Sequence, residues 1–237
     1  MAFPTDSART ATNISTAATS HAINVGSPVS GTMSIVFIRF AGAPGAVTFT
    51  GYTPIVTAEA SDASDDVTYV YYRSNDGTEG ATDTLTTGNS IKAAAITWTV
   101  TGQRDPIVSP PAVSTVAVGT TTLNTCDPGS VNGAIGSADY LFIALGGMDG
   151  EVGAFTAAPT NYTNFQAANS GTASTAATNC LIGGASRQLT ATSDNPGVFT
   201  HAAANSAWTA FTVAIAPALT VDTIMVGYNM GVSPGAY

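Results

Sequence analysis

Charge is scarce in this chain of 237 residues. Charged residues make up 9% of it, whereas a soluble domain usually carries about 25%. Six cationic residues stand against fifteen acidic ones, for a net charge of −9, so the chain lacks the cationic surface that contact with nucleic-acid phosphates requires. The same shortage argues against binding to an anionic membrane surface. We therefore expect neither a nucleic acid nor a membrane as a partner.

Cysteine and histidine are also scarce. The two cysteines, Cys126 and Cys180, make no disulfide framework. We interpret both as small buried apolar side chains, with one bridge between them as the alternative. The two histidines, His21 and His201, lie outside any nucleophile motif, and no Cys/His spacing indicates zinc. The sequence thus predicts no enzyme, and no catalytic, cofactor-binding or metal-binding residue.

Long apolar runs are missing as well. No run approaches the roughly 20 residues that a membrane-spanning helix needs. The first residues, Met1 to Asp6, have neither the basic nor the apolar region of a signal peptide. We expect the protein to be made in a cytoplasm and to stay there unless it is released inside a larger particle.

Two short apolar runs organise what is present. Val36–Gly42 and Leu141–Gly147 are too short for an ordinary helix, are rich in strand-favouring side chains, and end at glycine. Further matches follow in the same order: Gly51-Tyr52-Thr53 with Asn161-Tyr162-Thr163, Arg73 with Arg187, and Asn89-Ser90 with Asn205-Ser206. The separation between partners grows from 105 to 116 residues. This pattern is typical of a duplicated β unit with small insertions, although a shared β rhythm can also produce such pairs.

Many short strands, closely spaced turn signals and almost no amphipathic helix predict an all-β fold. We expect a single antiparallel β-sandwich or jelly roll over residues 21–217, built from two half-units at about 21–102 and 125–217 that bury their apolar faces against each other. Residues 1–20 are rich in Ala, Thr and Ser and are expected to form an extended arm. Residues 218–237 are expected to form a C-terminal tail.

A group of acidic residues invites comparison with calcium sites. Its members are Glu59, Asp62, Asp65, Asp66, Asp76 and Glu79. Carboxylate oxygens bind Ca²⁺, but the spacing differs from that of an EF-hand loop. A solvated loop is the simpler interpretation. Arg39 and Arg73, which interrupt or end apolar strands, are expected to pair with acidic loop residues and to fix the register of the sheet.

Aromatic side chains present a second candidate. Tyr69, Tyr71, Tyr72, Trp98 and Trp208 would stack on sugars if they were exposed. Packing in a core is the expected role of aromatic residues on strands, because each one buries a large area. Tyr69 and Tyr71 share one face of a strand, and Tyr72 lies on the other.

The order of these segments resembles a β-sandwich domain common among virion proteins of tailed bacteriophages. The resemblance is carried by Val36–Phe40, Gly51–Thr53, Tyr71–Arg73 leading to Gly77–Glu79, the run ending at Thr101-Gly102, and Trp208–Pro217. It covers about residues 21–217 and transfers no site residue.

The resemblance implies a virion structural protein without enzymatic activity, made in the host cytoplasm. The first hypothesis is a capsid decoration (cement) protein, often a homotrimer, that contacts the major capsid protein or other virion proteins. The alternative is a tail or fibre-tip domain that binds host glycans. A glycan-processing enzyme on a jelly roll is a third hypothesis, for which no carboxylate pair in the sequence speaks.

Overall fold

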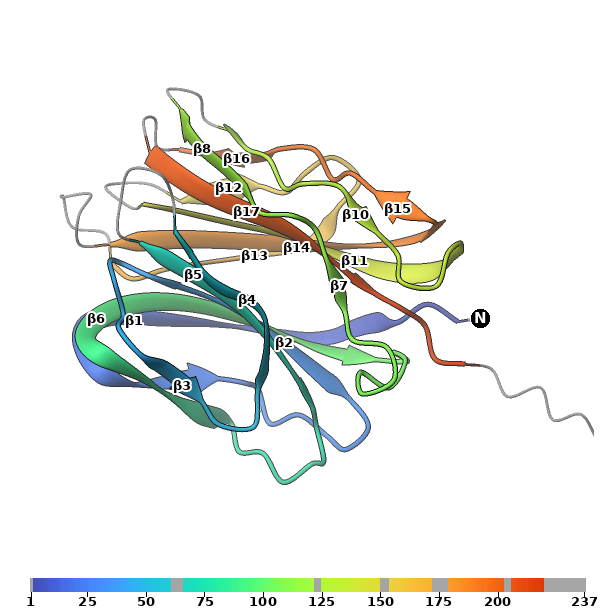
Figure 1. Ribbon diagram of the computed structural model, residues 1–237, viewed down its shortest axis with the longest axis horizontal. Coiled ribbons are helices and arrows are strands. Elements are labelled where there is room, and N and C mark those ends of the chain that lie inside the picture. Colours follow the sequence, from blue (N-terminus) through green and yellow to red (C-terminus); the bar gives the residue numbers. More distant parts are fainter. Residues whose placement is uncertain are drawn as a thin grey trace, which may run out of the picture.

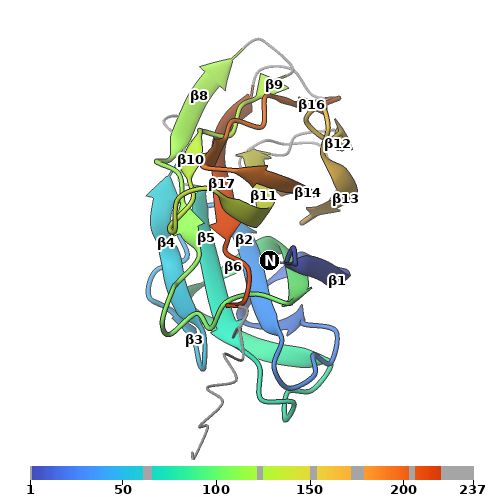
Figure 2. The same ribbon diagram turned by 90° about the vertical axis from the view of Figure 1, so that its right-hand side faces the viewer.

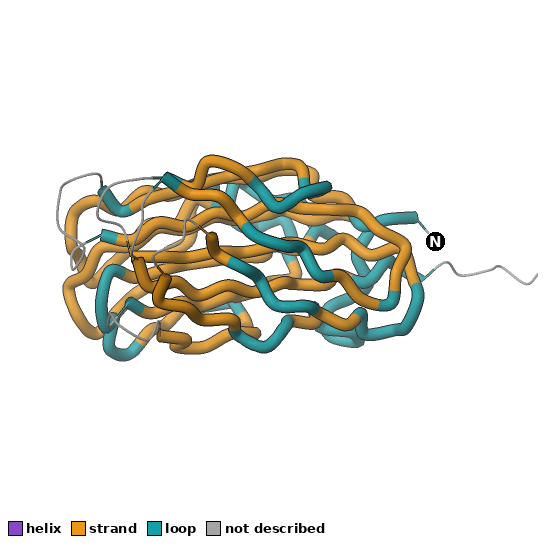
Figure 3. Tube along the Cα trace, turned by 90° about the horizontal axis from the view of Figure 1, so that it is seen from above, coloured by secondary structure: helices purple, strands orange, loops and turns teal. Residues whose placement is uncertain are grey.

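The computed structural model describes residues 2–60, 66–121, 125–149, 154–171, 179–202 and 206–219. Over these residues the chain contains strands and no helix. The strands form antiparallel sheets that pack face to face (Figures 1 and 3). The predicted all-β antiparallel sandwich is confirmed.

The N-terminal half supplies one sheet. Its strands are β1 (Thr5–Asn24), β2 (Met33–Phe40), β3 (Val47–Phe49), β4 (Thr53–Ala60), β5 (Val67–Ser74) and β6 (Thr82–Thr101). Their order is β1-β6-β2-β5-β4, and β3 pairs with the first part of β6.

The C-terminal half supplies the facing sheet and two small ones. Its strands are β7 (Ala112–Val113), β8 (Ala117–Thr121), β9 (Thr125–Cys126), β10 (Val131–Asn132), β11 (Ala138–Asp149), β12 (Phe155–Ala157), β13 (Thr163–Asn169), β14 (Cys180–Ala191), β15 (Ser193–Asp194), β16 (Phe199–His201) and β17 (Ser206–Ile215). The main sheet has the order β13-β14-β11-β17-β7, with β8 also on β17; the small sheets are β12-β16-β9 and β10-β15.

The two halves share one strand order. The path β6-β2-β5-β4 in the first sheet corresponds to β17-β11-β14-β13 in the second. The small sheet β12-β16-β9 also has a counterpart, because β3 and the last part of β1 both pair with the first part of β6. This agreement is what a duplicated unit would leave.

The residue-by-residue matching of β2 with β11 needs a correction. Arg73 lies opposite Ser34, whereas Arg187 lies opposite Phe142. If the two arginines are equivalent, β2 and β11 are related by 108 residues and not by 105. Successive side chains of a strand alternate between its two faces, so an offset that is wrong by three residues matches side chains on opposite faces. The offset of 105 pairs Phe37, in the core between the sheets, with Phe142, in the core on the outer side.

Three hydrophobic cores hold the described strands together. The first lies between the two main sheets and takes side chains from both halves, including Phe37, Trp98, Ile143 and Phe211. The second covers the outer face of the C-terminal sheet, and the third covers the outer face of the N-terminal sheet. The halves therefore bury apolar faces against each other, as predicted, and each half also has a core of its own. Figure 2 shows the two main sheets stacked one over the other.

The prediction that residues 1–20 form an arm is wrong. Strand β1 begins at Thr5 and pairs with β6 from Thr5 opposite Thr101 to Asn24 opposite Thr82. Most of its side chains are small and exposed or half-buried, so backbone hydrogen bonds to β6 hold this edge strand where little apolar burial is available. The predicted tail from residue 218 is described only as far as Leu219; residues 220–237 lie outside the described residues.

Candidate functional site

Arg39 is the charged side chain buried most deeply between the sheets. It lies on β2, on the face that also carries Ile35 and Phe37, and its exposed fraction is 0%. The facing strand β11 makes room for it with Gly147, where a Cβ atom would lie 2.9 Å from the Cδ of Arg39. The sequence therefore places a long cation where its neighbours on the same face are apolar.

Polar groups from both halves surround the guanidinium. Nη1 donates to the hydroxyls of Thr68 and Thr209, each at 3.0 Å. Nη2 donates to Asp149 at 2.8 Å, and Nε lies 3.4 Å from Asp66. We call these five residues the Arg39 cluster. Because Asp149 and Thr209 belong to the C-terminal half, the cluster ties the two halves together.

The cluster holds one cation and two carboxyl groups away from water. Burial is the main reason why the pKa of Asp66 is raised to about 8; the charge of Arg39 opposes this rise, and the charge of Asp149 adds to it. Asp66 is therefore mostly protonated at neutral pH and Arg39 and Asp149 form a compensated ion pair. A buried pair of this kind needs its remaining hydrogen bonds satisfied, and the threonine hydroxyls do this.

The Arg39 cluster has a structural role, because it connects the two halves of the chain. In an active site, the guanidinium would be the group that binds a negatively charged substrate. Its exposed fraction is 0%, so a substrate does not reach it. The predicted pairing of Arg39 with an acidic loop residue is confirmed by Asp66. The sequence interpretation missed Asp149, Thr68 and Thr209. The only sign of these partners in the sequence was Asp149, which ends the apolar run of β11.

A second polar motif occurs once in each half. Arg73 pairs with Asp83 at 3.2 Å, and Asp83 also accepts the hydroxyl of Tyr52 at 3.0 Å. In the C-terminal half Arg187 pairs with Asp194 at 3.2 Å, and Asp194 accepts the hydroxyl of Tyr162 at 2.5 Å.

Each tyrosine follows a residue with a positive φ angle, Gly51 at 83° or Asn161 at 67°. The predicted acidic partner of Arg73 is confirmed, because Glu79 also pairs with it at 3.0 Å. Each motif therefore connects the turn that carries the tyrosine to the strand that carries the arginine, β5 in the N-terminal half and β14 in the C-terminal half.

Histidine and cysteine are packed into the cores. Burial lowers the pKa of His21, whose Nε2 lies 3.1 Å from the Thr87 hydroxyl. His201 is 3% exposed and contacts the ring of Phe155. Cys126 and Cys180 are both buried and free, so the interpretation as buried apolar side chains is confirmed and the bridge is not formed. Burial raises the pKa of both thiols, to about 12 at Cys180, which disfavours the reactive thiolate.

The aromatic candidates for sugar stacking are buried. Trp98 is 0% exposed in the core between the sheets, and Trp208 is 8% exposed in the outer core of the C-terminal half. Tyr69 and Tyr71 share the outer core of the N-terminal half, and Tyr72 packs on the opposite face of β5, as predicted.

The acidic residues do not come together as a calcium site where they are described. Asp66 belongs to the Arg39 cluster. Asp76 and Glu79 accept backbone N–H groups of their own turn, at Thr78 and at Asp76 and Gly77. Asp62, Asp65 and the side chain of Glu59 lie outside the described residues. Among the residues that are described, no three His, Cys, Asp or Glu side chains group as metal ligands.

The described part of the chain has no helix long and apolar enough to span a membrane. Comparison of the chain with protein-family models, with curated proteins and with solved structures finds no match.

Proposed function

We propose that this protein is a structural component of a bacteriophage virion without enzymatic activity, and that it decorates the capsid by contacting the major capsid protein. The observation that supports this most is the use of its reactive side chains. In the described residues both histidines, both cysteines and both tryptophans are buried in the cores. Side chains that are buried in a core do not contact a substrate.

The exposed surface supports the same proposal. Along β1 the outward side chains are mostly Thr, Ser and Ala, and the whole chain has few charges. Charged residues are depleted from interface cores, so the scarcity of charge is what suits this surface to contact with a neighbouring protein. The trimeric assembly implied by the resemblance is part of the proposal.

Copies per particle give the first test. Quantitative mass spectrometry of purified virions should find the chain at hundreds of copies, because a decoration protein follows the capsid lattice. A few copies to a few dozen would place it in the tail and overturn the decoration role. Absence from the particle would overturn the whole proposal.

Binding gives the second test. The purified protein should co-sediment with capsids that lack it, and heating the mixture should show capsids that resist higher temperature than bare ones. Capsids of an unrelated phage are the matched control. A protein that stays in the supernatant with its own capsids contradicts the decoration role.

The glycan-binding alternative loses its two strongest residues, since Trp98 and Trp208 are buried. A glycan array should be silent with this protein. Binding that disappears in a folded Trp208→Ala variant would instead favour the fibre-tip role.

A further inference from the structure

Two segments that leave the main sheets meet at one end of the molecule. Residues 102–108 follow β6, and residues 216–219 follow β17 (Figure 1). They pair in antiparallel fashion, because the N–H of Arg104 donates to the carbonyl of Ala216 at 2.8 Å and the N–H of Ala218 donates to the carbonyl of Gly102 at 2.9 Å. The pairing fixes the side chains of both segments on one surface.

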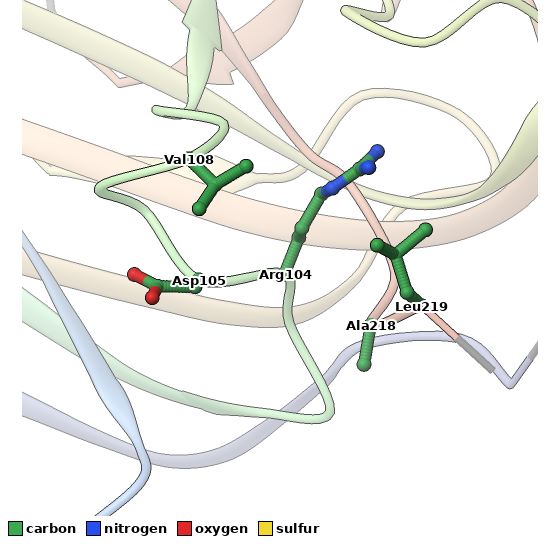
Figure 4. A pocket seen from close by; sticks show the side chains of 5 residues that line it. All are labelled: Arg104, Asp105, Val108, Ala218 and Leu219. Atoms are coloured by element: carbon green, nitrogen blue, oxygen red, sulfur yellow. The ribbon is translucent and has the colours of Figure 1, made fainter. Parts of the chain in front are cut away.

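This surface exposes large apolar side chains. Ile107 is 85% exposed, Val108 69% and Leu219 58%. A pocket of about 200 Å³ lies among Arg104, Asp105, Val108, Ala218 and Leu219 (Figure 4). We call Arg104, Asp105, Ile107, Val108 and Leu219 the linker patch. Exposed apolar residues that gather in this way, beside polar groups, mark sites of protein association.

Among the described residues, the linker patch contains an arginine whose charge is not matched. The other four arginines each pair with a carboxylate, on Asp6, Asp66 and Asp149, Glu79 and Asp83, or Asp194. The guanidinium of Arg104 has no hydrogen-bond or ion-pair partner within the part of the chain that the structure describes, and its Nε is buried.

Asp105 lies next to Arg104 in the sequence but does not neutralise it. One oxygen of Asp105 accepts the N–H of Ile107 at 2.9 Å. Figure 4 shows the carboxylate pointing away from the guanidinium of Arg104. The linker patch thus presents one carboxylate and one cation that is unmatched among the described residues, with Val108 between them and Leu219 beside the cation (Figure 4).

We propose that the linker patch is a two-fold contact between two copies of this chain. In a two-fold interface the same surface meets itself, so that residue i contacts residue j of the partner and j contacts i. The patch carries both members of a charge pair, so a two-fold axis through it matches each Arg104 with Asp105 of the other copy. Ile107, Val108 and Leu219 then pack at the centre and lose their exposure to water.

This contact does not depend on the proposed function. A three-fold assembly joins two different surfaces of each copy, so it would use other residues. The two ideas also fail separately. A trimer of unchanged mass in an Arg104 variant would leave the virion role intact and overturn the two-fold contact.

Sedimentation equilibrium over a range of protein concentrations tests the proposal. The mass of the wild-type protein should rise with concentration toward twice that of its smallest assembly. Arg104→Asp should weaken the dimer by about ten-fold, because two exposed ion pairs become two repulsive ones. Asp105→Asn keeps an oxygen for the Ile107 N–H, and should weaken the dimer to a smaller degree. Added salt should weaken the wild-type dimer in the same direction.

A mixing experiment makes the test specific. Arg104→Asp alone and Asp105→Arg alone should each associate through the patch about ten-fold more weakly than the wild type, since each patch then repels its own copy, whereas an equimolar mixture of the two variants should associate strongly. Circular dichroism and the thermal midpoint should match those of the wild type in each variant. A wild-type mass that does not rise with concentration, or an association that Arg104→Asp does not weaken, overturns the proposal.

Discussion

Arg39 lies in the apolar core between the two sheets, and its partners come from both halves of the chain. Replacing it by leucine would leave Asp149 buried without its cation. Loss of one partner from a buried ion pair costs about 3–5 kcal/mol. We therefore expect Arg39→Leu to lower the free energy of unfolding by that amount in denaturant titrations.

Arg9 provides the matched control. It pairs with Asp6 at 3.1 Å, but its side chain is 28% exposed. Exposed pairs contribute about 0–1 kcal/mol, so Arg9→Leu should change stability little. Equal effects of the two substitutions would contradict the role given to the Arg39 cluster.

Gly184 is a residue whose missing side chain matters. It lies on β14, and a Cβ atom there would sit 2.3 Å from Cη2 of Trp98 on the facing sheet. Gly184→Ala should therefore force Trp98 or the sheet to shift, which costs about 1–3 kcal/mol or more. Gly80→Ala is the control, because its Cβ would meet no atom closer than 3.7 Å. Thermal denaturation of both variants checks this; a stable Gly184→Ala protein would show that the contact gives way easily.

At the scale of elements, β1 tests how much an edge strand with little apolar burial contributes to stability. Deleting residues 2–14 should expose the edge of β6 from Ala93 to Thr101. It should also remove the hydrogen bond of 2.7 Å from Ser186 to Asp6. We expect the thermal midpoint to fall by more than about 5 °C and aggregation through the free edge to increase.

Substitutions in the same strand separate pairing from side-chain effects. Thr16→Ser and Ala17→Ser lie at an exposed register shift of β1 and should leave the midpoint unchanged. If the deletion also left it unchanged, residues 2–14 would behave as the arm that the composition predicts.

The sequence predicted the fold class because the fold class rests on local signals. Strand-favouring runs such as Val67–Arg73 and turn residues such as Gly51 act through their own backbone preferences. The strand β1 was missed, because an Ala/Thr/Ser segment that is held by its backbone and by polar contacts shows no apolar pattern. The end of the second apolar run was also misplaced. Gly146 and Gly147 do not end β11, which continues to Asp149.

The end of β11 was misplaced because Gly146 and Gly147 serve packing between segments that are distant in the sequence. A Cβ at Gly146 would lie 2.8 Å from the sulfur of Cys126, and one at Gly147 would lie 2.9 Å from Arg39. These glycines admit large side chains from the two faces of the sheet, and no local pattern records that. The same holds for the Arg39 cluster. Arg39 itself stands out in an apolar run, but its partners Asp149 and Thr209 become neighbours only when the two halves meet.

For the whole molecule, the Arg39 cluster makes the free energy of unfolding depend on pH. The pKa of Asp66 is about 8 in the folded protein and about 3.9 in an unfolded chain. Between these values the folded state binds one more proton than the unfolded state. The free energy of unfolding should therefore fall as pH rises through this window, by up to about 1.4 kcal/mol for each pH unit.

Other groups limit where this slope is best measured. His21 has a lowered pKa, so its contribution is lost as pH falls below its ordinary value of about 6.5. Cys126 and Cys180 have raised pKa values, and they add a decline of the same sign as Asp66 once free thiols ionise, near pH 8.5. Asp66 therefore dominates between about pH 6.5 and pH 8.

Denaturant titrations across this window test the coupling. Because the pKa of Asp66 is about 8 in the folded protein, about half a proton is released by pH 8, and the wild-type protein should lose about 1.6 kcal/mol from pH 6.5 to pH 8. Asp66→Asn cannot ionise, yet its amide can still donate to Asp149, so its stability should be nearly flat. Asp139→Asn, at an exposed carboxyl whose pKa is lowered by the Thr190 hydroxyl, should keep the wild-type slope. A wild-type protein with flat stability would mean that Asp66 stays ionised between the sheets, and that the hydroxyls of Thr68 and Thr209 and the charge of Arg39 suffice to hold two carboxylates.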